Sequence, residues 1–365
     1  MRYLISLVFA ILALVEVGPL AAQDDPSKNV FEKLQIHGHL TQAYGASTGP
    51  TVLGIPDDGT TDYRTVALQF RYDHDDRNAF VIQFNHQRLA SDTLFQDDVE
   101  LDWAFYQRRI GDHTQVRVGR ILTPLGLLNE VRDVGTVLPF YRVPETFYGE
   151  ASFSLETIDG LSVSHTFEGS SGSLELIGYF GGWDSVDQGP GGIAEGRIEE
   201  GIGLTAIVET AVEGLRFGAG YNEHKAAGGL VPEGTRQPRD FWWASAELDR
   251  DRYSFIVELF RRDRFVALDE GGYAQASFWP KERLGLHVQT EHHDLTRSEP
   301  IFQDLNPIDL VEDYAAGFSF LFGSHAMVKG EYHWSMARNA DGVGLFATDE
   351  EARFEYYVVS LAVSF

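Results

Sequence analysis

The last thirteen residues of the chain alternate with a period of two, as the side chains of a strand do. The odd-numbered positions form a wholly apolar face: Tyr357, Val359, Leu361, Val363 and Phe365. The opposite face becomes small and polar toward the end of the sequence. A strand with lipid on one side and a watery lumen on the other has this pattern, although the last strand of a soluble β domain remains an alternative.

The same alternation recurs along the chain and predicts half-buried strands rather than helices. We expect about sixteen of them, at 33–44, 62–73, 79–90, 97–110, 113–122, 154–168, 173–183, 197–212, 214–224, 240–249, 252–264, 270–279, 283–294, 311–322, 325–336 and 353–365. Short gaps take turns with longer ones, which is typical of barrels with tight turns at one end and long loops at the other. The predicted fold is all-β, a single transmembrane antiparallel barrel, and one of this size encloses a water-filled lumen.

The first 22 residues differ from the rest and read as a secretory signal peptide. Arg2 precedes an apolar run from Leu4 to Val15, and Ala22 ends a plausible cleavage site. An N-terminal anchor helix is the alternative. Residues 23–365 then form one β-barrel domain, because no later stretch is apolar enough for a spanning helix.

Composition supports a barrel in a membrane. The 365 residues include 25 Phe, 15 Tyr, 6 Trp and 37 Gly, but no Cys, and the formal net charge is -26. So acidic a chain is a poor partner for nucleic acid, whereas acidic loops suit a surface where divalent cations bridge them to lipopolysaccharide. Four tryptophans are predicted to lie in interfacial girdles that contact membrane lipid: Trp103, Trp242, Trp279 and Trp334.

The longest gap, at about 123–152, follows the fifth strand and is the third connection at the loop end. It is too apolar for a disordered segment, and the side chains that indicate this are Leu125, Leu127, Leu128, Val131, Val134, Phe140 and Tyr141. Long loops inside one domain are usually functional. We therefore predict that this loop folds into the barrel, buries those side chains on the inner wall and narrows the pore.

Charged side chains on the predicted inner faces and in this loop are candidates for pore lining. They are Arg71, Arg108, Arg117, Arg120, Arg132, Arg142, Glu100, Asp102, Glu130, Asp133 and Glu145. Arg117, Arg120, Arg132 and Arg142 are the strongest candidates for a constriction, because the root and body of the loop bring them to one level. Mixed charges create a transverse field that favours polar solutes, and the net acidity favours cations. Alternatively, many of these groups, and inner-wall carboxylates such as Glu258, Glu291 and Glu331, are ion pairs that hold the wall together.

Other chemistry is weakly indicated. The pairs His37 with His39 and His292 with His293 lack a third ligand, so no metal site and no cofactor are predicted. Ser164 and His165 are strand neighbours whose side chains point to opposite faces, so they cannot act as a nucleophile and its base. We expect no enzymatic activity. A barrel enzyme of the lipase or protease type, and a closed structural or adhesive barrel, remain the alternatives to a channel.

The segment from Gly119 to Glu150, which contains RILTPLGLLNEVRDVG and LPFYRVPETFYGE, and the terminal strand ending in Phe365 resemble Gram-negative outer-membrane porin-like proteins. Such proteins are distantly similar to the phosphate-selective porins. The resemblance implies a sixteen-stranded barrel in the outer membrane that passes small hydrophilic solutes, often as a homotrimer. Phosphate-selective members line their constriction with Arg and Lys. Here Arg132 and Arg142 stand beside four carboxylates in the loop, Glu130, Asp133, Glu145 and Glu150, so phosphate selectivity is not expected.

Overall fold

The computed structural model describes residues 32–49, 51–90, 99–149, 156–189, 192–228, 237–264, 267–297, 308–337 and 352–365. The predicted signal peptide, 1–22, lies outside the described residues. The described chain is almost entirely strand.

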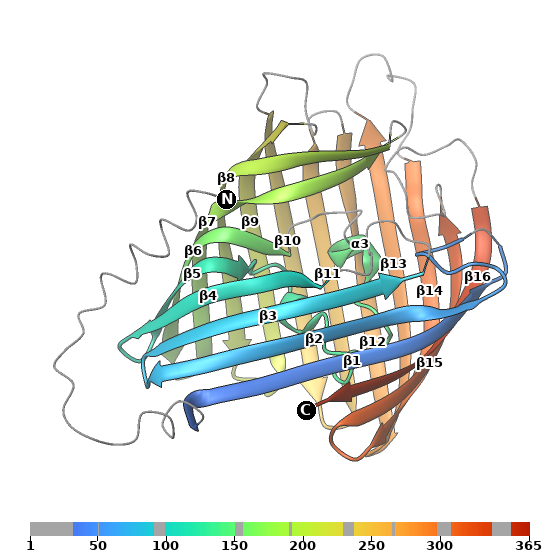
Figure 1. Cartoon of the computed structure of the whole chain (residues 1–365), viewed down its shortest axis with the longest axis horizontal. Helices are drawn as coiled ribbons and strands as arrows, with labels where there is room; N and C mark the ends of the chain where they lie inside the picture. Colours follow the sequence, from blue (N-terminus) through green and yellow to red (C-terminus); the bar gives the residue numbers. More distant parts are fainter. Residues whose placement is uncertain are drawn as a thin grey trace.

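Sixteen strands of the described chain form one closed antiparallel barrel, as the alternation predicts (Figure 1). Each strand pairs with its neighbours in sequence, and β1 pairs with β16 to close the ring. The strands are β1 (Leu34–Ser47), β2 (Thr60–Asp75), β3 (Asn78–Leu89), β4 (Glu100–Ile110), β5 (Thr114–Leu122), β6 (Thr157–Gly169), β7 (Gly172–Gly189), β8 (Gly192–Thr210), β9 (Leu215–Gly228), β10 (Gln237–Arg250), β11 (Tyr253–Arg264), β12 (Ala267–Lys281), β13 (Leu284–Arg297), β14 (Ile308–Phe322), β15 (Ala326–Ala337) and β16 (Ala352–Ser364).

The seam between β1 and β16 closes on the last residue of the chain. The backbones of Phe365 and Gly38 exchange two N–H···O hydrogen bonds of 3.0 Å. The Phe365 ring lies over Gly38 so closely that a Cβ on Gly38 would approach a ring carbon to 2.3 Å. A glycine in β1 therefore makes room for the terminal aromatic ring.

The two faces of β16 have the environments that its alternation predicts. The odd-numbered face is turned outward, and Phe365 is 68% exposed at its end. The even-numbered side chains are buried inside the barrel: Phe354, Tyr356, Val358, Ser360 and Ala362. Exposed apolar side chains also cover the outer faces of other strands, for example Phe318, Phe320 and Phe322 of β14.

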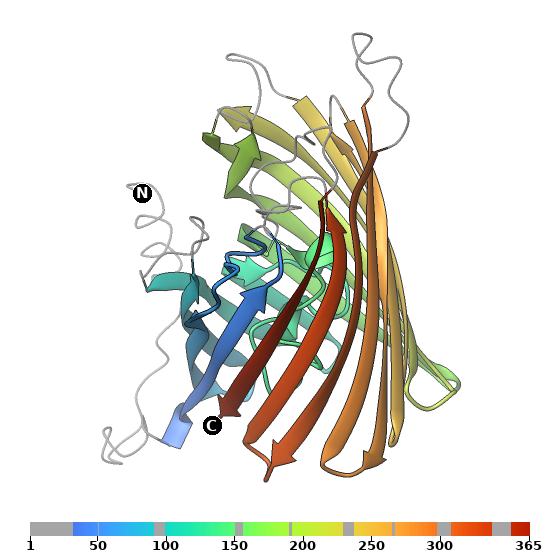
Figure 2. The same ribbon diagram turned by 90° about the vertical axis from the view of Figure 1, so that its right-hand side faces the viewer.

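The connections alternate in length, with tight turns at one end of the barrel and longer connections at the other (Figure 2). The prediction of a long connection at 184–196 is wrong. The β7–β8 ladder continues from Trp183 opposite Ile198 to Gly189 opposite Gly192, so most of this segment is a projecting hairpin. The segment is rich in glycine and charged residues, so it shows no hydrophobic alternation from which a strand could be predicted. Backbone hydrogen bonds nevertheless extend both strands through it.

The predicted inward and outward faces of β4 are wrong beyond a register shift in that strand. The β3–β4 pairing shifts between Gln83 and Phe84. Beyond this bulge Trp103 faces the interior and is only 5% exposed, and Phe105 and Gln107 follow on the same face. One extra residue inverts the alternation of everything after it.

Two of the four tryptophans expected in girdles lie elsewhere. Trp103 is inside the barrel, and Trp279 contacts the inward-facing His287 with ring centroids 5.6 Å apart. Trp242 and Trp334 are exposed on the outer face as predicted.

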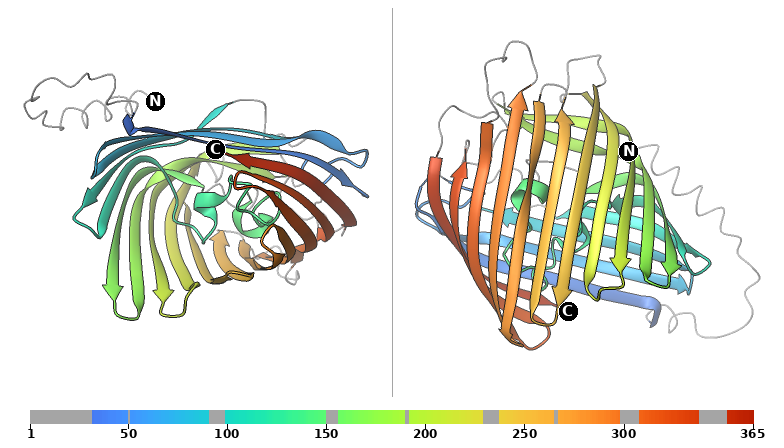
Figure 3. Two further views of the ribbon diagram at one scale, coloured as in Figure 1. Left: turned by 90° about the horizontal axis from the view of Figure 1, so that it is seen from below. Right: turned by 180° about the vertical axis from the view of Figure 1, so that it is seen from behind.

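The third loop lies inside the ring of strands, as predicted (Figure 3). It contains two short helical turns, η1 (Asn129–Val131) and α3 (Glu145–Tyr148). No helix of the described residues is long and apolar enough to cross a membrane.

Candidate functional site

The outgoing half of the third loop crosses the barrel interior. It leaves β5 and is bound first at β8, where Thr205 donates a 2.7 Å hydrogen bond to the Pro124 carbonyl. Its far end meets the seam, since a Cβ on Gly135 would lie 2.2 Å from the Thr41 hydroxyl oxygen of β1. Thr136 donates a 3.3 Å hydrogen bond to Ser364 of the last strand. The loop therefore reaches from β8 to the β1–β16 seam inside the ring of strands.

Three carboxylates on alternate strands hold the loop by its backbone. Glu331 of β15 accepts from the Tyr141 N–H at 2.7 Å, and Glu291 of β13 accepts from the Thr146 N–H at 2.8 Å. Glu258 of β11 accepts from the Leu127 N–H at 2.8 Å. Charge-assisted bonds of this kind are about twice as strong as neutral ones. These inner-wall glutamates are thus anchors for the loop.

Glu258 is the centre of the strongest anchor and is 0% exposed. Besides the loop amide, it accepts hydrogen bonds from the hydroxyls of Ser245 and Tyr273, both at 2.5 Å, and from Tyr148. Gly126 lies beside this carboxylate with a φ of 59°, in the left-handed region. A Cβ there would lie 2.8 Å from Glu258 Oε1. Only glycine permits the loop to approach so closely.

An apolar cluster reinforces these polar anchors. Leu125, Leu138, Val143 and Phe147 of the loop pack against inward-facing side chains of β10, β11 and β12. Those wall partners are Phe241, Trp243, Ile256, Phe260 and Tyr273. The prediction that apolar loop side chains bury themselves on the inner wall is confirmed, and this part of the wall is aromatic rather than wet.

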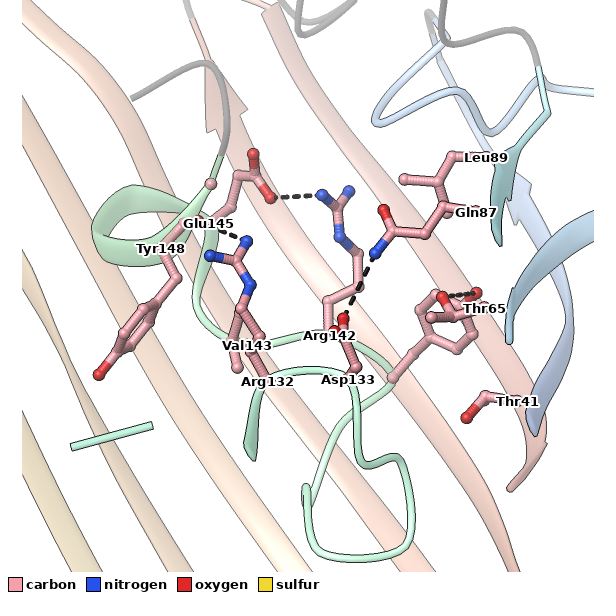
Figure 4. Close-up of a pocket in the computed structure, with 12 residues that line it drawn as sticks. Thr41, Thr65, Gln87, Leu89, Arg132, Asp133, Arg142, Val143, Glu145 and Tyr148 are labelled. Carbon is pink, nitrogen blue, oxygen red and sulfur yellow. Dashed lines mark hydrogen bonds and ion pairs between the residues drawn. The ribbon is translucent and has the colours of Figure 1, made fainter. Parts of the chain in front are cut away.

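A small cavity lies between the loop and the wall formed by β1, β2 and β3 (Figure 4). It leaves about 40 Å³ open to the centres of water molecules, which is room for about three waters at 10–15 Å³ each. Its polar and charged lining includes Thr41, Thr65, Gln87, Arg132, Asp133, Arg142 and Glu145. Four of the predicted site residues therefore meet at one place: Arg132, Asp133, Arg142 and Glu145.

The charges around this cavity are held in fixed positions. Arg142 pairs with Glu145 at 3.0 Å, and Arg132 donates to the Tyr148 carbonyl at 3.0 Å. Gln87 donates to Asp133 across the gap at 3.4 Å. Burial raises the pKa of Asp133 to about 7, and the negative charge of Glu156 acts in the same direction.

A second charged pair links the loop to β5. Arg117 lies on the inner face, where its guanidinium is 3.2 Å from Glu130 of the loop and 5.4 Å from the centroid of the Phe105 ring. Glu130 has a side chain that is 66% exposed although it is inside the barrel, so this pair borders open space. Glu100 lies opposite Asn85 near the loop end of β4 and is also exposed.

Three predicted site residues lie away from the loop. Arg71 pairs with Asp73 at 2.8 Å near the tight-turn end, where both border a wider cavity. Arg108 follows the β4 bulge and lies on the outer face, so its predicted inward position is wrong for the reason given above. Arg120 pairs at 3.1 Å with Asp159, two residues from the exposed Leu161 on the outer face. The alternation around Gly119 and Gly160 thus turns Arg120 away from the interior.

Sequence reasoning missed the role of the anchors. Glu258, Glu291 and Glu331 were recognised as inward-facing, but their partners are loop amides more than a hundred residues away. Backbone amides carry no sequence signature. The one available signal was the spacing of glutamates on alternate strands of the same inner wall.

Comparison with solved structures gives the fold a context. OmpF of Salmonella typhi, solved in complex with daunomycin, is similar with a TM-score of 0.63 at 11% identity, covering 91% of this chain and 97% of that chain. The outer membrane channel DcaP of Acinetobacter baumannii has a TM-score of 0.59 at 10% identity, with coverage of 91% and 97%. OmpT of Vibrio cholerae, described as an outer membrane protein in a trimer form, has a TM-score of 0.57 at 11% identity, with coverage of 91% and 99%.

These likenesses show a shared barrel fold, at identities too low to carry function. No protein-family model matches the sequence, and no curated protein matches it. Any specificity for phosphate that the porin resemblance might suggest gains no support from these comparisons.

Proposed function

We propose that this protein is an outer-membrane diffusion channel of a Gram-negative bacterium. Small hydrophilic solutes or ions would pass down their gradients through a pore narrowed by the loop at about 123–152. The observation that carries the proposal is a barrel wall that is apolar on its outer face and encloses charged groups. Apolar side chains cover the outside of a closed sixteen-strand barrel, and a firmly anchored, charged loop lies within it.

The passage would run past the charged edge of the loop. Arg142 with Glu145 and Arg117 with Glu130 provide paired charges of both signs. Paired charges set up a transverse field that favours solutes with a dipole, and they give no strong preference for either sign of ion. The chain's acidity would add a mild preference for cations.

The setting follows from the same proposal. The signal peptide at 1–22 would direct export, membrane lipid would surround the apolar belt, and lipopolysaccharide would contact the acidic loop end. The fold shared with a trimeric OmpT supports a homotrimer. Catalysis is not part of the proposal. His165 is bound to Thr114 at 2.7 Å, and its strand neighbour Ser164 points to the other face.

A liposome swelling assay with sugars of increasing size tests this proposal. Vesicles that contain the folded protein should swell quickly in small sugars and progressively more slowly in larger ones. Vesicles that contain heat-denatured protein give the baseline. Swelling no faster than this baseline with the smallest sugar would exclude an open diffusion channel.

A further inference from the structure

Three carboxylates from separate segments meet where the loop joins the wall. Asp102 comes from the bulged part of β4, Asp133 from the loop just after η1, and Glu156 from the residue preceding β6. One oxygen of each lies within 4.8 Å of the others. The β4 bulge is part of this arrangement, because it turns both Asp102 and Trp103 toward the interior.

The cluster has unused acceptors in a buried place. Asp133 is only 8% exposed, and its Oδ2 has no hydrogen-bond partner among the described residues. Glu156 Oε1 is likewise a buried acceptor without a hydrogen bond, although Arg132 Nε is 3.6 Å away. Asp102 accepts from Gln83 at 2.9 Å. Buried acceptors of this kind normally have a partner, so the site lacks one.

The charges at the site also do not balance. Two arginines act on these three carboxylates in the described part of the chain, and both have other partners. Arg132 is shared with the Tyr148 carbonyl and the Asn129 side chain, and Arg120, which also acts on Asp102, pairs with Asp159. An excess of buried negative charge is costly unless it is neutralised.

We propose that Asp102, Asp133 and Glu156 bind a hard divalent cation, Ca²⁺ in particular. Ca²⁺ takes oxygen ligands at about 2.3–2.6 Å, so two ligand atoms of one ion are at most about 5 Å apart. The spread of the three oxygens meets that limit without rearrangement. Mg²⁺ needs a tighter shell, at about 2.0–2.1 Å, and would require the carboxylates to move closer.

The ion would join the loop to the wall at a further place. The glutamate anchors hold the loop on β11, β13 and β15, whereas this site ties it to β4 and the start of β6 on the opposite side. Ca²⁺ would therefore fix the outgoing half of the loop. This inference does not rest on the channel function, because binding is measured on the purified barrel.

Terbium luminescence offers a direct test, since Tb³⁺ replaces Ca²⁺ and is excited by a nearby indole. Trp103 adjoins Asp102 on the interior side of β4. The folded full-length protein, stripped with EDTA, should bind one Tb³⁺ per chain with tryptophan-sensitised emission, and Ca²⁺ should displace it. Asp133→Asn and Asp102→Asn should each lose this signal. Asp112→Asn, which removes the same charge from an exposed turn, should keep it.

Trp103→Phe separates binding from reporting. This variant should lose the sensitised emission while still taking up one Ca²⁺ per chain by calorimetry. The proposal is overturned if the wild-type protein gives no sensitised emission, or if Asp133→Asn and Asp102→Asn retain it. If Asp133→Asn or Asp102→Asn fails to fold, the Tb³⁺ stoichiometry of the wild type and the result for Trp103→Phe still show whether the site binds one cation beside Trp103.

Discussion

At the scale of single residues, most of the charge inside the barrel is structural. Wall carboxylates face the lumen as their strand positions predict, yet they are occupied by loop amides and hydroxyls. The charges left to act on a solute are those paired along the loop itself. Substitutions at Glu258 and at the Arg142–Glu145 pair separate these roles.

Removal of the Glu258 anchor should weaken the barrel and release the loop. Glu258→Ala removes the buried acceptor of the hydroxyls of Ser245, Tyr148 and Tyr273. Each such group costs about 1–3 kcal/mol. We expect a loss of about 2 kcal/mol or more in the free energy of unfolding, measured by urea titration. Glu168→Ala, at the exposed end of β6, should change this free energy little.

Substitution at the Arg142–Glu145 pair should change ion selectivity in opposite directions. Arg142→Gln removes a positive charge beside the cavity and should move the reversal potential under a salt gradient toward cation preference. Glu145→Gln should move it toward anions. Arg250→Gln, at a tight turn, serves as the control. Equal potentials for all three variants would mean that this pair lies off the conduction path.

At the scale of elements, periodicity predicts what is repeated and fails where one residue breaks the repeat. The strands and the terminal face follow from alternation alone, and the apolar content of the third loop correctly predicts its burial. The β4 bulge could not be predicted, because no residue type marks it, and it moved Trp103 inside and Arg108 outside. The extension of the β7–β8 hairpin could not be predicted for a related reason, because backbone hydrogen bonds pair the two strands there without an apolar face.

The candidate site was predictable in its location but not in its contacts. The charges of the loop could be named from sequence, and four of them do line one cavity. The acidic cluster could not be foreseen, because Asp102, Asp133 and Glu156 come from three segments and meet only when the bulge and the loop are both in place.

The last strand offers an element-scale prediction about closure. Gly38→Val would place a side chain where the Phe365 ring now lies, with a clash at 2.3 Å from the Cβ position alone. Overpacking of this kind costs about 1–3 kcal/mol. We expect a lower yield of heat-modifiable, folded barrel in a refolding gel assay. Phe322→Ala, which removes an exposed ring at another strand end, should refold like the wild type.

At the scale of the whole molecule, the arrangement is a closed cylinder that is apolar outside and carries its charge within and at its ends. The third loop is bound to the inner wall at β8, β15 and β16, so it is fixed in place inside the barrel. Shortening it, by replacing residues 126–147 with a short Gly/Ser linker, should widen the passage. The altered barrel should show a larger single-channel conductance, and an unchanged value would place the narrowest point elsewhere.

The central claim is that water and ions pass through this barrel. Its most direct test is the current through a planar lipid bilayer after addition of the purified, folded protein. The structure predicts discrete, stepwise increases in conductance of uniform size, with a small reversal potential under a salt gradient because the lining charges are paired. A bilayer that stays silent, although the folded barrel is shown to be inserted, would contradict the account.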